Sequence, residues 1–282
     1  MYDYDGNELL NAYGINSAEL EQAYDINGNP LIAVSNLVVM TYNVGRFQGI
    51  NAQQNLQNHI IELYKPDIIG MQELGASTLP TVGANMLSEY RVKQLSNHTN
   101  KIMMVTKNKS LSNLVIADFE NQDPKDMSYY GETRAYMKAD ISVGGKTVTW
   151  INAHLCYHTV SVKYAQMAEL FAMAEQCDYV VLTGDFNSTA ITESSNEYIN
   201  MFKPYYDAGY NLANNSPTAG FHNTWGDAAA PTSLSDLSWA CDSIITSSNI
   251  NIDSVIFDPT KLDYLNGDQI DHIPVIATLT VE

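Results

Sequence analysis

The sequence predicts an α/β protein in which two β-sheets pack against each other and helices lie outside. Short apolar and β-branched runs, typical of strands, recur from residue 37 almost to the end of the chain. Few stretches have helical periodicity, so two packed sheets fit better than one doubly wound sheet. With 45% hydrophobic residues in 282, the chain can bury a sizeable core.

Local patterns justify each predicted element. Residues 37–42 (LVVMTY) and the VVLTGDFN stretch begin as continuous apolar runs, which are typical of strands covered on both faces. Gly144-Gly145 joins two strand-like segments, as in a hairpin. The predicted strands are 37–42, 67–71, 90–95, 101–106, 111–119, 134–143, 146–155, 179–182, 242–246, 252–257 and 273–281, and the predicted helices are 51–64, 160–176 and a segment near 195–206.

Residues 1–36 differ from the rest of the chain. They contain an approximate repeat, YDYDGNELL and YDINGNPLI, whose Asp-Gly and Asn-Gly pairs signal hairpin turns. A calcium loop fits poorly, because the glycine comes too early and the closing glutamate is missing. We expect an N-terminal extension with two turn elements, either a tether for assembly or a partly ordered tail. No low-complexity linker interrupts residues 37–282, which we interpret as one domain.

Charge and composition restrict the possible functions. The net charge of −18 argues against tight, metal-free binding of nucleic acid, but it allows an enzyme that meets phosphate through a divalent cation. Cys156, Cys177 and Cys241 form neither a disulfide framework nor a zinc pattern, so we expect free buried thiols. No transmembrane run or signal peptide is visible, which favours the cytoplasm or a larger secreted or viral assembly, without membrane insertion.

Polar side chains stand at the ends of several predicted strands. Asp185 and Asn187 follow the VVLTGDFN strand two residues apart, so both can point the same way. Each polar end alone is compatible with a turn, a helix cap or a half-buried histidine. Their recurrence in one chain indicates a common site. The other strand-end residues are Asn43, Glu73, His154, Asp242, Asp271 and His272.

These residue types suit phosphoester hydrolysis. Glu73 is a hard oxygen ligand for Mg²⁺ or Mn²⁺, and Asn43 and Asp271 can orient or extend the ligand shell. A histidine paired with a carboxylate, such as His272 with Asp242, can act as a base or stabilise charge.

The remaining candidates suit the handling of water and phosphate. Asp185 and Asn187 can hold a nucleophilic water or a phosphoryl oxygen, and His154 can donate to the phosphate. A divalent metal neutralises the charge on the phosphoryl oxygens as the transition state forms.

The motifs TYN, QE, NAHL, GDFN and DHIPV, in this order, resemble those of the endonuclease/exonuclease/phosphatase superfamily, the deoxyribonuclease I-like fold. The resemblance covers about residues 37–281 and implies a four-layered α/β sandwich with mostly antiparallel sheets and a site at one edge of them. It implies that Asn43 and Glu73 belong to the metal site and that Arg134 contacts phosphate. His154 would be the first catalytic histidine, and Asp185 and Asn187 would form the GD-x-N pair. Asp271 and His272 would form the terminal pair, with Asp242 as the partner of His272.

The sequence also departs from the family patterns. Deoxyribonuclease I-like enzymes partner the first histidine with a glutamate, whereas the corresponding region here offers Asn100 and no carboxylate, so His154 is less polarised or has another partner. Cys241 and Ser243 flank Asp242, which disfavours inositol-polyphosphate phosphatases. We find neither the apolar hairpin of bacterial sphingomyelinases nor the inserts of abasic-site endonucleases.

We therefore expect a divalent-metal-dependent nuclease that hydrolyses phosphodiester bonds and leaves a 5′-phosphate. Nucleic acid is the favoured substrate because of the Arg134 match and the missing lipid features. One alternative is a sphingomyelinase-like or phospholipase C-like enzyme, or a small-molecule phosphatase, on the same scaffold. Another is an assembly component that carries a passenger hydrolase and is attached through residues 1–36. Arg46, His158 and Lys163 remain open between substrate contact and a solvated surface role.

Overall fold

The structure is a computed structural model, and it describes residues 36–45, 61–74, 90–94, 101–107, 109–126, 133–189, 192–215, 223–225, 238–258 and 272–282. Its strands are β1 (Asn36–Asn43), β2 (Ile68–Leu74), β3 (Tyr90–Gln94), β4 (Lys101–Lys107), β5 (Ser112–Asp118), β6 (Ala135–Val143), β7 (Lys146–His154), β8 (Val180–Asp185), β9 (Asn211–Leu212), β10 (Asp242–Thr246), β11 (Ile250–Phe257) and β12 (Val275–Val281). Its helices are α6 (Val160–Ala174), η1 (Tyr198–Phe202), α7 (Lys203–Asp207) and η2 (Ala213–Asn215).

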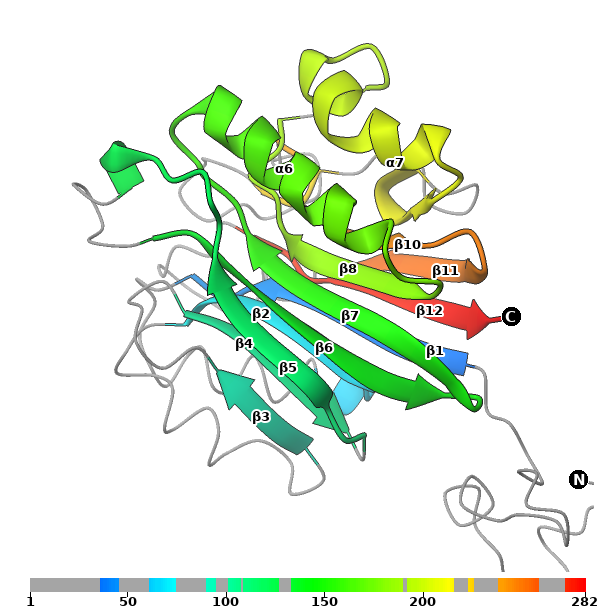
Figure 1. Cartoon of the computed structure of the whole chain (residues 1–282). Helices are drawn as coiled ribbons and strands as arrows, with labels where there is room; N and C mark the ends of the chain where they lie inside the picture. The colour runs from blue at the N-terminus through cyan, green and yellow to red at the C-terminus, as the bar shows by residue number, and fades with distance from the viewer. Residues whose placement is uncertain are drawn as a thin grey trace, which may run out of the picture.

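The strands form two six-stranded sheets (Figure 1). The first has the order β11-β12-β1-β2-β4-β3, and the second has the order β5-β6-β7-β8-β10-β9. Only β1 with β2 and β7 with β8 pair in parallel among the described strands. The predicted architecture of two packed, mostly antiparallel sheets is therefore confirmed.

The helical predictions have mixed outcomes. The helix predicted over 160–176 is α6, which lies over the second sheet (Figure 1). The segment near 195–206 divides into the π-helical η1 and the α-helical α7, where Pro204 occupies the first turn. A proline suits this position because its missing N–H has no partner there anyway. Of the helix predicted over 51–64, residues 61–64 are helical and the others lie outside the described residues.

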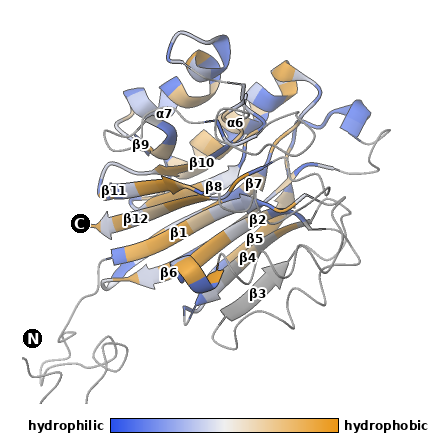
Figure 2. Cartoon of the chain, turned by 180° about the vertical axis from the view of Figure 1, so that it is seen from behind, coloured by the Kyte–Doolittle hydropathy of each residue, from blue (hydrophilic) through white to orange (hydrophobic). Residues whose placement is uncertain are grey.

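Two apolar cores hold the layers together. The core between the sheets contains side chains such as Val39, Ile68 and Trp150. The second core lies between the second sheet and its helices and includes Leu182 and Tyr205. Hydrophobic colour accordingly runs along the inner strands, whereas the helices carry hydrophilic stretches (Figure 2). Strand β8 is buried along its whole length, as its continuous apolar run predicts.

A buried polar network crosses the space between the sheets. Gln72 donates from Nε2 to Asn152 Oδ1 at 2.8 Å, and Thr183 Oγ1 donates to the same oxygen at 3.1 Å. Trp150 Nε1 donates to Thr183 Oγ1 at 2.9 Å. Gly70 faces this network, and a Cβ there would overlap Thr183 Oγ1 and Asn152 Oδ1. The network thus sets how closely β2 approaches β7 and β8.

The cysteine prediction is partly wrong. Cys156 and Cys241 are free and buried, as expected. Cys177 is free but half-buried, because it follows α6 at the turn that leads to β8. Among the described residues, no helix has the length and apolar character needed to cross a membrane.

Replacing Gly70 with alanine should destabilise the protein by about 1–3 kcal/mol, the usual cost of overpacking a close-packed interior. The new methyl group must displace Thr183 or Asn152, and Asn152 accepts the hydrogen bond from Gln72 that joins the two sheets. Urea unfolding of both proteins measures the effect. An unchanged midpoint would show that the sheets separate easily at this point.

Candidate active site

The strand register brings the polar strand ends to one edge of both sheets. Asn43 pairs with Gln72, the residue before Glu73, where β1 and β2 end together. In the second sheet, His154, Asp185 and Asp242 lie side by side on β7, β8 and β10. Asn43 Nδ2 donates to Asp185 Oδ2 at 2.8 Å, so the two edges meet.

Asp185 is the centre of this cluster and is 1% exposed. His154 Nε2 and His272 Nε2 lie 3.3 Å and 3.7 Å from Asp185 Oδ2, and the Asn187 N–H donates to Asp185 Oδ1 at 2.8 Å. Burial by itself raises the pKa of the Asp185 carboxyl. The two histidines and Asn43 outweigh it and hold that pKa well below its usual range. Asp185 is therefore a buried carboxylate whose surroundings favour its charged form.

His272 forms a pair with Asp242. His272 Nδ1 lies 2.7 Å from Asp242 Oδ2, which also accepts a hydrogen bond from Thr224 Oγ1 at 2.7 Å. Burial raises the pKa of the Asp242 carboxyl, the charge of Asp185 raises it further, and His272 opposes both. The pair orients the His272 ring so that Nε2 points toward Asp185 and Asn43.

His154 is flanked by a guanidinium that a second carboxylate holds. Arg134 Nη1 lies 3.0 Å and 3.2 Å from the two ring nitrogens of His154. Arg134 Nε and Nη2 donate to the two oxygens of Asp126 at 3.0 Å and 3.3 Å. Burial lowers the pKa of Arg134, but Asp126 outweighs it and the pKa is raised. His154 therefore does have other partners, Arg134 and Asp185; Asn100 lies outside the described residues.

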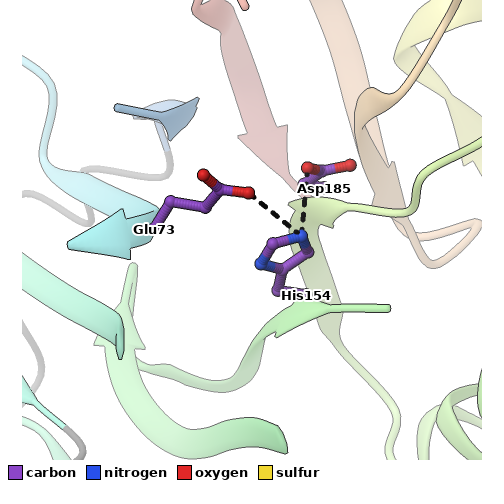
Figure 3. A group of neighbouring side chains, drawn as sticks. All are labelled: Glu73, His154 and Asp185. Carbon is purple, nitrogen blue, oxygen red and sulfur yellow. Dashed lines mark ion pairs between the residues drawn. The ribbon is translucent and has the colours of Figure 1, made fainter. Parts of the chain in front are cut away.

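Glu73 reaches the cluster through an irregular backbone. Its φ is +58°, and the pairing of β2 with β4 shifts between Met71 and Leu74, as at a β-bulge. Such bulges redirect side chains near functional sites. The Glu73 side chain is 22% exposed, and its Oε1 lies 3.9 Å from His154 Nε2 (Figure 3). Asn187 is also left-handed, with φ of +50°.

The donor atoms fit a divalent cation. Glu73, His154 and Asp185 each offer one ligand atom within 4.8 Å of the others, and Figure 3 shows these three side chains converging. Asp185, Asp242 and His272 form a second set, in which one ligand atom of each residue also lies within 4.8 Å of the others. The carboxylate oxygens suit Mg²⁺ or Mn²⁺, whereas the imidazole nitrogen suits Zn²⁺.

The predicted metal residues are only partly placed. Glu73 belongs to the first donor set. Asn43 lies beside it but binds protein groups at both ends of its amide, donating to Asp185 and accepting from the Gly45 N–H at 2.9 Å. Asp271 lies outside the described residues.

Lys163 is not a solvated surface residue, so that interpretation of it was wrong. It is buried on the inner face of α6, where Nζ donates to the backbone carbonyl of Asn187 and to Glu197. His158 is partly exposed, with Nε2 3.8 Å from Asp126 Oδ1. Arg46 lies outside the described residues.

Sequence reasoning also missed a pair of tryptophans beside His272. Trp225 forms isolated backbone bridges to Trp239 and to His272. The two indole rings stack with centroids 4.3 Å apart and an interplanar angle of 21°. Both side chains are partly exposed, so a stacked aromatic pair lies next to His272 in the chain's bridging pattern. Trp239 stands three residues before Asp242, a spacing that could have indicated it.

The sequence matches no protein-family model and no curated protein. Solved structures, however, match across most of the chain. An endonuclease/exonuclease/phosphatase from Bacteroides vulgatus has a TM-score of 0.69 and 16% identity, over 88% of this chain and 99% of that chain. A mannosyl-6-phosphatase from Bacteroides thetaiotaomicron has a TM-score of 0.69 and 13% identity, over 86% and 99%.

A third similar structure is TDP2 from D. rerio in complex with a single-strand DNA product. Its TM-score is 0.69 with 14% identity, over 88% of this chain and all of that chain. At these identities the likeness concerns the fold. The four-layered sandwich that the motifs implied is confirmed, and this chain has the fold of the endonuclease/exonuclease/phosphatase family.

Proposed function

We propose that the protein is a divalent-metal-dependent phosphoester hydrolase. The observation that carries this proposal is the convergence of two histidines, Asn43 and Asn187 on the buried charge of Asp185, with Glu73 at the open side. A structural salt bridge needs one cation for one carboxylate. This cluster instead combines groups that bind a cation with groups that move protons.

Glu73 would hold the cation through its carboxylate. Asn43, whose amide is hydrogen-bonded to Asp185 and Gly45, would orient the ligand shell, with Asp271 as the expected third residue. When bound, the cation supplies positive charge to the phosphoryl oxygens of the substrate. It also allows a protein with a net charge of −18 to accept an anionic substrate.

Each remaining residue has a proposed role in proton transfer or orientation. The Nε2 atom of His272 accepts the proton of the attacking water, and Asp242 stabilises the imidazolium that results. Asp185 and Asn187 orient that water. His154 and Arg134 donate to the phosphate, and Asp126 keeps Arg134 in place through two hydrogen bonds.

The favoured substrate is nucleic acid. The stacked Trp225–Trp239 pair offers a flat, partly exposed surface beside His272, and base stacking on aromatic rings is a common mode of single-strand binding. The likeness in fold to a TDP2 that holds a single-strand DNA product supports the same choice.

A sugar-phosphate monoester is the second candidate. The charge of −18 disfavours long polyanions more than small ones. An apolar indole face also packs against a sugar ring, and one similar fold is that of a mannosyl-6-phosphatase.

The first experiment compares supercoiled plasmid, single-stranded oligonucleotide and mannose 6-phosphate as substrates with Mg²⁺ and with Mn²⁺. We expect cleavage of the oligonucleotide that EDTA abolishes. If mannose 6-phosphate is the one substrate hydrolysed, with release of inorganic phosphate, the second candidate function, a sugar-phosphate monoesterase, is supported instead. A folded protein that is inert on all three and on sphingomyelin would contradict the proposed function.

Replacing His272 with alanine should lower kcat by at least about 100-fold, since a positioned general base contributes about 10²–10⁴-fold. Metal affinity should change little, because His272 acts on water. Isothermal titration with Mn²⁺ and circular dichroism are the controls for metal binding and folding. A wild-type rate in this variant would refute the assigned role.

Replacing Glu73 with glutamine should raise the Mg²⁺ concentration needed for half-maximal activity by about 10–100-fold, the usual effect of weakening a metal site. The rate at saturating Mg²⁺ should fall much less. Activity measured over a Mg²⁺ series tests this. An unchanged Mg²⁺ requirement would remove Glu73 from the metal site.

A further inference from the structure

A buried ion pair lies behind the candidate site. The Lys163 side chain on α6 is 4% exposed, and its Nζ donates to Glu197 Oε1 at 2.6 Å. The same ammonium donates to the backbone carbonyl of Asn187 at 2.5 Å. Lys163 therefore links α6 to the turn that follows β8.

Glu197 holds the same turn from its other end. Its Oε2 accepts hydrogen bonds from the backbone N–H of Thr189 and from Thr189 Oγ1, the latter at 2.8 Å. The ion pair thus binds the first and the last residue of the turn 187–189, and Ser188 between them is fully buried.

This turn carries a candidate site residue in a costly conformation. Asn187 has φ of +50°, a left-handed conformation that asparagine adopts more readily than most non-glycine residues but that still costs more than extended or right-handed backbone. Its N–H donates to Asp185 Oδ1 at 2.8 Å, and its Nδ2 donates to the carbonyl of Leu155 at 2.9 Å. A shift of the turn would move the Asn187 amide and one hydrogen bond of the central carboxylate together.

We propose that Lys163 and Glu197 are positioning residues that hold the turn 187–189, so that Asn187 faces the substrate. The inference rests on the proposed function, since it assigns the pair an effect on hydrolysis through Asn187. Stability alone accounts poorly for the pair, because a buried ion pair is often no more stabilising than apolar residues of similar size. Its hydrogen bonds, in contrast, end on the backbone of this turn.

The test uses Lys163→Met, Glu197→Gln and the double variant. Each single variant leaves one buried charge without its partner and can impair folding. The double variant removes both charges, so a loss of activity in it cannot be attributed to an unpaired buried charge. Lys203→Met is the matched control, because Lys203 forms an equally short 2.6 Å pair with Asp207 that is largely exposed and lies outside the site.

We expect the folded double variant to lose at least about 10-fold in kcat with less than about a threefold change in KM, as for a lost transition-state interaction. The Lys203→Met control should match the wild type. A double variant with wild-type kcat would overturn the proposal.

A double-mutant cycle with Asn187→Ala separates positioning from general structural support. If Lys163 acts through the Asn187 side chain, Lys163→Met should cost much less in the Asn187→Ala background than in the wild type. Full additivity of the two losses would contradict positioning.

Amide hydrogen exchange distinguishes failure of this inference from failure of the proposed function. We expect faster exchange of the Asn187 and Thr189 amides in the double variant and unchanged exchange in Lys203→Met. Should the wild type hydrolyse no phosphoester, the proposed function fails, and faster exchange would still support the clamp on the turn. Unchanged exchange would overturn the clamp whatever the activity.

Discussion

The buried charge of Asp185 is the constraint on which the rest of the site depends. An ionised carboxylate that is nearly excluded from water is stable only when nearby donors and cations compensate its lost hydration. Here the compensation comes from Asn43 at the end of β1, from His154 at the end of β7 and from the Asn187 N–H just after β8. The charge can therefore be accommodated only when both sheets end at the same edge. The candidate site therefore forms only when the two sheets pack in this relative position.

The position of that edge depends on how the sheets meet further inside. Gln72 and Asn152 join β2 to β7 by a hydrogen bond one residue before Glu73 and two residues before His154. Polar groups in a buried interface must find specific partners, whereas apolar side chains tolerate sliding. This network therefore fixes the relative register of the two sheets close to the site, which apolar packing alone does not do. Gly70 permits it, since any larger residue would occupy the same space.

The sequence predicts the strands and their polar ends well, because both depend on local patterns. Continuous apolar runs locate β1 and β8, and candidate site residues stand at the ends of both strands. Asp126 could not be predicted, since its contact with Arg134 depends on the tertiary structure and on no local pattern. Lys163, in contrast, could have been predicted to be buried. Residues 163, 167, 170 and 174 share the buried face of α6, as their helical spacing indicates.

Backbone strain occurs at two of the site residues. Of the four non-glycine residues with positive φ in the described chain, Glu73 and Asn187 lie in the site, and each such residue costs on the order of 1 kcal/mol or more. Glycine would relieve the strain but would remove the carboxylate or the amide. Each strained residue is instead held by its surroundings, Glu73 by the bulge of β2 and Asn187 by its bonds to Asp185, Leu155 and Lys163. The surrounding contacts therefore maintain the backbone at both residues, which keeps the Glu73 carboxylate beside His154 and the Asn187 N–H on Asp185.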